Sequence, residues 1–349
     1  MSHAKLIVFS KEIAEKGVKD MIETLVRSEE IRPDVFIAVA NTTANDYLTS
    51  VNPEMEVNPA QYYQLIYQKN QLVGIPDGQL REFFTGLYTD NYDSILPVAG
   101  VIEGSGGNSQ NDDKGQSKDG QNEGSEGSSE SLDSFESKSS NEKDENEKEK
   151  DAEKNTSKYE YDIKNYVGGE TAIEKKNKAE AIGAAVFEKD KMVGELGEVE
   201  TEICKMLKGD YTYSYLTYYN NDTDIPITVK TTQQKKPKYK IDTDKKTVDI
   251  ELYIESDLYS LPADYNVENK IEDFERDVAN YTSSACTEFI NNFTKKYNSD
   301  ILKLNEKIKY KFLTNNQYNW FKKNVGWSEY KFSVCTNFKV RRTGLIVRE

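Results

Sequence analysis

The chain has 349 residues and a formal net charge of −15 at pH 7. Its length allows two or three domains that each bury a core. No basic stripe with interleaved aromatic residues occurs, so we do not expect nucleic acid as a partner, because such binding needs a positive face that displaces phosphate counterions.

The first hundred residues alternate strand and helix signals. Residues 6–9 predict an apolar strand, and Ser10 is a suitable N-cap for a single following helix. The predicted strand at 35–40 is apolar on both faces, which is typical of a strand inside a sheet that helices cover. The helix after Ser10 is expected to bury Ile13, Val18, Met21, Ile22 and Leu25. Further helices are predicted at 45–51, 59–70 and 78–88, and a strand at 94–102.

Residues 103–157 have a composition unlike the rest of the chain. They contain 16 acidic residues and 7 lysines, with only Leu132, Phe135 and Ala152 as apolar side chains. Ordering each residue costs roughly 1 to 2 kcal/mol of backbone entropy, which so few apolar side chains cannot offset. We therefore expect a disordered acidic insert, as a tolerated surface loop or, alternatively, as a regulatory or matrix-binding tether.

A hairpin followed by a helix is predicted after the insert. Residues 184–187 form an apolar strand, residues 188–191 a charged turn, and Met192 begins the return strand. Gly194 and Gly197 are expected to break that strand. The following helix has one apolar face and stops at Gly209. That face consists of Val199, Ile203, Met206 and Leu207.

The last part of the chain predicts strands at 213–219, 225–232 and 247–252, then a long helix. The helix carries an apolar stripe at three- and four-residue spacing, which we expect to pack on the C-terminal sheet; an intermolecular coiled coil is the alternative. The stripe comprises Val267, Ile271, Phe274, Val278, Tyr281, Ala285, Phe289 and Phe293. The final strand, 330–340, alternates apolar and polar residues, which indicates one buried face.

The sequence offers little for catalysis. The single histidine, His3, is at the N-terminus, and Cys204, Cys286 and Cys335 lack zinc-type spacing and are interpreted as unpaired. Glu198, Glu200 and Glu202 stand at a helix start, where carboxylates ordinarily meet the helix dipole. We expect no catalytic residue, no cofactor and no metal ion, and hence no enzyme.

Two basic clusters are candidate contacts with anionic lipid or an acidic partner. One contains Lys235, Lys236, Lys238 and Lys240, expected in a loop between two strands. The other, at the end of the last strand, contains Arg341, Arg342 and Arg348. Solvated loop charges are the alternative interpretation of both.

Three separated blocks resemble one protein family. They are residues 3–39, the hairpin and helix with Gly183, Phe187, Gly194, Glu200 and Thr201, and the C-terminal residues Asp300, Ile301, Trp320, Trp327 and 341–346, which include Gly344. Together they resemble the Ger(x)C family, the lipoprotein C subunit of spore nutrient germinant receptors. Gly183, Phe187, Gly194, Glu200 and Gly344 match as structural motif residues. Lys303 and Leu304 depart from the pattern, which has glycine after the Asp-Ile pair.

The resemblance and the element pattern imply an α+β, multidomain fold, with mixed and antiparallel sheets covered by helices. We expect a partial N-terminal α/β domain at 1–102, the insert at 103–157, a small hairpin-helix domain at 158–224 and an α+β domain at 225–349. Members begin with a secretory signal and a lipid-modified cysteine. Here the first cysteine is Cys204, so we expect an N-terminally truncated chain without signal peptide, lipobox or lipid anchor.

The resemblance also implies a function. Members are non-catalytic subunits on the outer face of the spore inner membrane, beside two integral-membrane subunits, and enable nutrient-triggered germination. Docking to those subunits is the expected role. An extracytoplasmic solute-binding protein that recognises the germinant directly is the alternative, and a hydrolase using acidic residues is a third hypothesis.

Overall fold

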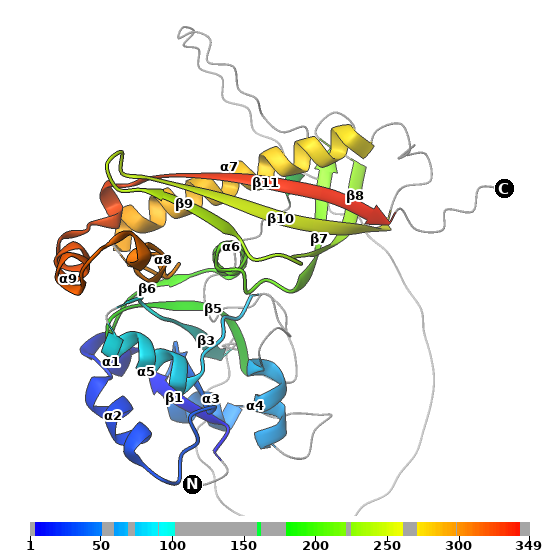
Figure 1. Ribbon diagram of the computed structural model, residues 1–349. Coiled ribbons are helices and arrows are strands. Elements are labelled where there is room, and N and C mark those ends of the chain that lie inside the picture. Colours follow the sequence, from blue (N-terminus) through cyan, green and yellow to red (C-terminus); the bar gives the residue numbers. More distant parts are fainter. Residues whose placement is uncertain are drawn as a thin grey trace, which may run out of the picture. The chain divides into compact units, whose positions relative to one another are not determined.

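The computed structural model describes residues 4–50, 59–68, 74–89, 91–101, 159–161, 179–220, 225–260, 271–297 and 299–342. The predicted insert at 103–157 lies outside these residues, as do His3, Val267, Gly344 and Arg348. Within the described part, helices and two mixed sheets form an α+β protein (Figure 1), which confirms the predicted fold class.

The first sheet has five strands in the order β1-β2-β3-β5-β6. They are β1 (Leu6–Ser10), β2 (Phe36–Ala40), β3 (Ile95–Val101), β5 (Ala179–Glu188) and β6 (Lys191–Leu196). The first three are parallel, and β5 and β6 add antiparallel pairs. The predicted hairpin therefore completes a sheet that begins at the N-terminus.

Helices cover both faces of this sheet. On one face, α1 (Lys11–Lys16), α2 (Lys19–Arg27) and α5 (Leu80–Thr89) contribute to a core with Ile37 and Phe187. On the other face, α3 (Ala44–Ser50) and α4 (Pro59–Tyr67) contribute Tyr47 and Tyr67. Every residue of β2 is buried, as the sequence predicted.

The single helix predicted after Ser10 is wrong, because the chain breaks at Gly17. This residue has φ +117°, a backbone conformation that favours glycine, and a Cβ there would lie 2.6 Å from Asp190 Oδ2. Because of the break, the buried face of α2 does not continue the helical periodicity of α1. Ala14, Val18 and Ile22 are consequently buried, whereas Ile13 and Met21 are exposed.

The strand break predicted at Gly194 is also wrong. Strand β6 continues to Leu196, and Gly194 pairs with Val186. A Cβ at Gly194 would overlap the ring of Tyr297, so glycine here makes room for an aromatic side chain. The strand ends instead at Gly197, where α6 (Glu198–Lys208) begins, and Gly209 with φ +81° ends that helix.

The second sheet has the order β11-β10-β8-β7-β4, and β9 pairs with β10. These strands are β4 (Tyr159–Tyr161), β7 (Tyr213–Asn220), β8 (Ile225–Thr232), β9 (Lys238–Asp242), β10 (Thr247–Ser260) and β11 (Lys331–Arg342). Strands β10 and β11 are parallel, and the other pairs are antiparallel. Strand β10 extends eight residues beyond its predicted end at 252 and so pairs with both β9 and β8.

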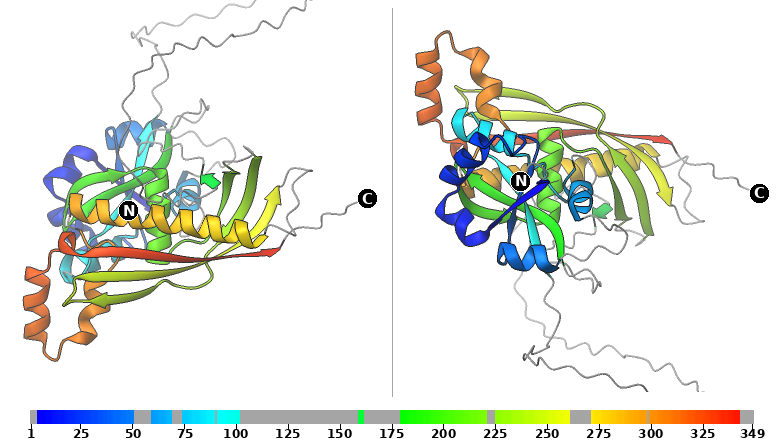
Figure 2. Two further views of the ribbon diagram at one scale, coloured as in Figure 1. Left: turned by 90° about the horizontal axis from the view of Figure 1, so that it is seen from above. Right: turned by 90° about the horizontal axis from the view of Figure 1, so that it is seen from below.

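The long helix α7 (Ile271–Tyr297) lies along this sheet (Figures 1 and 2), as predicted. Its apolar side chains enter two cores shared with the sheet, through Phe274 and Val278 in one and Phe289 and Phe293 in the other. Strand β11 alternates as predicted, with Phe332, Val334, Thr336 and Phe338 buried.

A helical segment separates α7 from β11. It comprises α8 (Leu304–Ile308), the 3-10 turn η1 (Lys309–Lys311), α9 (Asn315–Asn324) and the 3-10 turn η2 (Trp327–Glu329). We call residues 299–329 the α8–α9 lobe. Lys303, before α8, has φ +58°, in the left-handed region that favours glycine. The glycine that the resemblance led us to expect at this point would adopt this conformation more easily than lysine does.

Candidate contact surfaces and pockets

Half of the first basic cluster lies on a strand, whereas the sequence predicted a loop for all four lysines. Lys238 and Lys240 project from β9, and Lys235 and Lys236 precede it. Strand β9 forms because Tyr239 and Ile241 alternate with the lysines, which places Ile241 in the core. This alternation was the signal that could have revealed β9 in the sequence.

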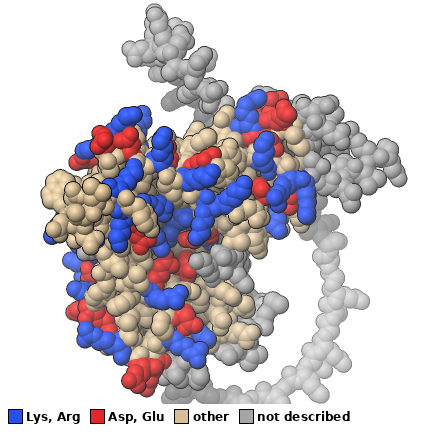
Figure 3. All heavy atoms as spheres, in the orientation of Figure 1, with Lys and Arg blue, Asp and Glu red and all other residues tan. Residues whose placement is uncertain are grey.

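Tyr253 on β10 organises these lysines. Lys238 Nζ donates to Tyr253 Oη at 3.0 Å, and the ammonium groups of Lys235 and Lys238 lie 5.3 and 5.0 Å from the ring centroid. The hydrogen bond to Tyr253, together with nearby Glu251, raises the pKa of Lys238 above its usual value. Lys and Arg side chains lie over β9 and β10 in Figure 3, interspersed with acidic side chains.

The structure does not join the two basic clusters. Lys238 lies opposite Glu251 of β10, whereas Arg342 lies opposite Asp257. Glu251 and Asp257 are six residues apart along β10, a separation of about 20 Å in an extended strand. Arg341 forms an ion pair with Glu255 at 2.9 Å. The two clusters are therefore separate surfaces.

The described motif residues all shape the backbone or the core. Gly183 has φ +82°, and Phe187 is fully buried with its ring edge-to-face against Phe83 at 5.1 Å. Gly194 accommodates Tyr297. Glu200 Oε2 accepts a hydrogen bond at 3.0 Å from the backbone N–H of Gly197, which caps α6.

The three carboxylates at the start of α6 do not converge. Glu200 acts as the cap, burial raises the pKa of Glu198, and Glu202 lines a pocket instead. Among the described residues no group of three His, Cys, Asp or Glu side chains could hold a metal ion. No helix within the described ranges combines the length and apolarity required to cross a bilayer.

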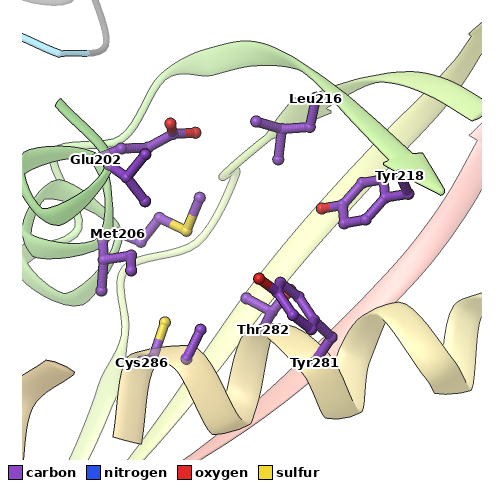
Figure 4. Close-up of a pocket in the computed structure, with 10 residues that line it drawn as sticks. Glu202, Met206, Leu216, Tyr218, Tyr281, Thr282 and Cys286 are labelled. Carbon is purple, nitrogen blue, oxygen red and sulfur yellow. The ribbon is translucent and has the colours of Figure 1, made fainter. Parts of the chain in front are cut away.

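A small, mostly apolar pocket lies between α6, β7 and α7 (Figure 4). Figure 4 shows Glu202 and Met206 on α6, Tyr218 on β7, and Tyr281, Thr282 and Cys286 on α7. Its volume is about 40 Å³, which holds two or three water molecules and no amino acid or sugar. Burial raises the pKa of Cys286 to about 12, so this thiol is protonated at neutral pH and a poor nucleophile.

A larger, polar cleft of about 510 Å³ lies where the first sheet meets the α8–α9 lobe. Its lining includes Asp93, Lys189, Asp300, Lys323 and Trp327. Asp93 N donates to Asp300 O at 3.1 Å, and Asp300 N donates to Asp93 Oδ2 at 2.9 Å. Sequence reasoning missed this cleft, because nothing local pairs residues so far apart in the chain.

Asp300 is a buried acid in the cleft. Its carboxylate accepts hydrogen bonds from the backbone N–H groups of Leu304 and Asn305, at 2.7 and 2.8 Å. Complete burial outweighs these bonds and raises the pKa of Asp300 to about 7. The residue fixes the start of α8.

The described part of the chain is thus an α+β protein with two mixed sheets, separate basic surfaces and two buried thiols, Cys204 and Cys286. Comparison with known families gives its class. A model described as "Spore germination protein N-terminal domain" matches residues 1–101, and one described as "Spore germination B3/ GerAC like, C-terminal" matches residues 182–344. The two matches cover most of the chain in family order, so the chain belongs to the Ger(x)C family of spore germination proteins.

Individual relatives agree with this assignment. Spore germination protein GerQC of Bacillus cereus is 27% identical over 99 residues, which are 28% of this chain and 27% of that protein. The match therefore spans about a quarter of that relative's length. The crystal structure of the GerBC protein superposes with a TM-score of 0.59, covering 97% of this chain and 79% of that one. Its identity is 14%, so this likeness shows a shared fold.

Proposed function

We propose that the protein is a non-catalytic subunit of a spore nutrient germinant receptor that docks to the two integral-membrane subunits. The observation that carries the proposal is the ordered match to both family domains. Cys204 and Cys286 are buried, which raises the pKa of each thiol to about 12 and makes both poor nucleophiles. In this proposal the protein lies at the outer face of the spore inner membrane, held in the family by a lipid.

The proposed docking surface is the β9 cluster of Lys235, Lys236, Lys238 and Lys240, with Arg341 and Arg342 as a second contact. Lysines on a solvent-facing strand keep other strands from pairing with it and still attract an acidic partner. Salt-sensitive encounter is the expected consequence, because the charges act mainly on the association rate.

Co-purification with the membrane subunits at low and high ionic strength tests this proposal. Reversing the charge at Lys235, Lys236 and Lys238 should reduce recovery most strongly at low salt. The matched control reverses three other exposed lysines, Lys295 and Lys296 on α7 and Lys331 on β11. Equal recovery of both variants rules out the β9 surface, and failure of the wild-type protein to associate undercuts the docking role itself.

Direct recognition of the germinant is the second candidate function, and the polar cleft is the observation that favours it. The cleft has ample volume for an amino acid and contains carboxylates and ammonium groups, which suit a zwitterion. Calorimetric titration of the purified protein with amino acids and sugars tests it. Saturable binding that Lys323→Glu weakens supports the cleft, whereas no heat across the series argues against it.

We also propose the domain division at 1–102, 103–157, 158–224 and 225–349. Strand pairing crosses two of these boundaries, because β5 and β6 pair into the first sheet while β7 pairs into the second. Separate expression of 225–349 tests whether that part folds alone. A cooperative unfolding transition supports the division, and its absence assigns the two sheets to one folding unit.

A further inference from the structure

Large apolar side chains are unusually exposed on the α8–α9 lobe. Tyr310, Leu313 and Trp320 are 92%, 94% and 69% exposed. Outside the lobe, only Tyr259 at 70% is comparable among the large apolar side chains of the described residues. Single exposed apolar residues need no explanation, but three within eleven residues mark an interaction surface.

The lobe is ordered beneath these side chains. The ring of Phe312 packs against Tyr318 and Phe321, with centroids 5.8 and 4.9 Å apart. Thr314 Oγ1 accepts a hydrogen bond from Gln317 N at 3.3 Å and caps α9. Leu313 therefore stands in solvent between two anchored residues. Its exposure is built into the fold and does not result from a missing core contact.

The lobe is also positively charged. Its residues, 299–329, contain six lysines against Asp300, Glu306 and Glu329, a net charge of +3. The ammonium groups of Lys307, Lys311 and Lys322 donate to backbone carbonyl oxygens. Within the described part of the chain, Lys303 forms an ion pair with Glu82 at 2.8 Å, and no carboxylate forms an ion pair with the other five lysines. Asp300 and Glu306 act electrostatically on Lys307, and Lys311 acts on Asp242, so the excess positive charge of the lobe is modest.

The arrangement in space favours a membrane surface over a protein partner. Helix α9 projects beyond the strands in Figures 1 and 2, and the surface over it is largely uncharged in Figure 3. Tyrosine and tryptophan beside lysine are typical of the boundary between headgroups and acyl chains.

We propose that the α8–α9 lobe binds an anionic phospholipid bilayer directly. Leu313 and Trp320, with Tyr310, enter the headgroup boundary, and the lysines, Lys309 and Lys323 foremost, contact anionic headgroups. This binding requires neither a lipid anchor nor a receptor subunit. It goes beyond the proposed receptor role and is independent of it.

The two tryptophans make the test specific. Trp320 is exposed and Trp327 is buried, so Trp320 dominates changes in solvent access. The full chain is mixed with protein-free vesicles of phosphatidylglycerol and phosphatidylcholine, or of phosphatidylcholine alone. With anionic vesicles the fluorescence should shift to the blue, and brominated acyl chains should quench it. The Trp320→Phe variant should lose most of this response.

Sedimentation with the same vesicles measures affinity. Leu313→Ser combined with Trp320→Ser should weaken binding at least tenfold. Lys309→Gln combined with Lys323→Gln should weaken it about 25-fold at low salt, since each lysine near such a surface is worth about fivefold. Tyr259→Ser, an equally exposed aromatic on β10, is the matched control and should bind as the wild type does. Thermal melts should be unchanged, because all these side chains are exposed.

The proposal is overturned if anionic vesicles are not bound, or if the lobe variants bind as the Tyr259 control does. It is also overturned if Trp320 is protected only on vesicles that contain the integral-membrane subunits, which identifies the lobe as a protein contact. Because the first vesicles contain no protein, failure here leaves the docking proposal untouched.

Discussion

The side chain of Asn291 on α7 forms two hydrogen bonds with the backbone of Phe332 on β11. Asn291 Nδ2 donates to Phe332 O at 2.9 Å, and Phe332 N donates to Asn291 Oδ1 at 3.1 Å. The pattern continues along the helix: Val334 N donates to Thr287, Thr336 N to Ser283, and Val340 N to Glu275.

This series closes the free edge of the second sheet. Four helical residues rise about 6.0 Å and two strand residues about 6.6 Å, so every second N–H of β11 meets the next turn of α7. Strand β11 is at the end of the sheet order, where unpaired N–H groups would otherwise recruit another strand. Only position 279, an alanine, interrupts the series.

Asn291→Ala should lower the free energy of unfolding by about 1 to 3 kcal/mol, because two backbone groups lose their partner in a half-buried position. Urea denaturation measures the difference. Asn292→Ala, one residue further on the exposed side of the helix, is the control and should change stability by less than about 0.5 kcal/mol. Equal effects of the two substitutions would show that the edge contacts contribute nothing.

Phe274→Ala should cost roughly 3 to 5 kcal/mol, since it removes a buried side chain and leaves a cavity. Phe274 lies edge-to-face with Tyr218 and Phe338, with ring centroids 6.2 Å from each. Tyr259→Ala, on the exposed face of β10, should cost far less. A loss under about 1 kcal/mol at Phe274 contradicts the packing of α7 on the sheet.

Gly194→Ala should destabilise the protein by about 1 to 3 kcal/mol, because the new methyl group overlaps the Tyr297 ring. Shortening that ring, as in Tyr297→Leu, should recover part of the loss in the double variant. A double-mutant cycle in urea measures this coupling. Gly326→Ala is the control, since a Cβ there would lie 3.6 Å from Ser328 Oγ, an ordinary contact distance. Additive effects at 194 and 297 would refute the clash.

Asp300 should make stability depend on pH. Its pKa is raised from 3.8 to about 7 by burial, so folding favours the protonated form. The stabilising contribution is complete below about pH 4 and is lost as the pH rises through 7, because the unfolded chain then releases the proton more easily. Between pH 5 and pH 8 the loss should be roughly 2 to 3 kcal/mol.

Asp300→Asn should remove this part of the pH dependence. The measurement is the difference in unfolding free energy between wild type and variant, at pH 5 and at pH 8. The unfolding free energy of the wild type, relative to that of the variant, should be higher at pH 5 than at pH 8. A difference that is constant across this range would mean that Asp300 remains ionised in the folded protein.

Short-range features could be predicted from the sequence. The hairpin at 184–193, the stop of α6 at Gly209 and the alternation of β11 all arise from neighbouring residues, whose periodicity and turn chemistry act over a few positions. The apolar stripe of α7 could be predicted in the same way. The family resemblance depended on these same local blocks, and the matches to both family domains confirm it.

Contacts between distant residues were decided by the tertiary structure alone. After the break at Gly17, Val18 N donates to Asp190 O, Gly194 leaves room for the ring of Tyr297, and the polar cleft forms where Asp93 meets Asp300. Each partner lies about a hundred residues or more away. Apolar spacing alone favoured a continuous helix through Gly17, although glycine costs about 1 kcal/mol in a helix interior. Glycine favoured a strand break at position 194, but packing between distant segments outweighs a single-residue strand preference of about 1 kcal/mol.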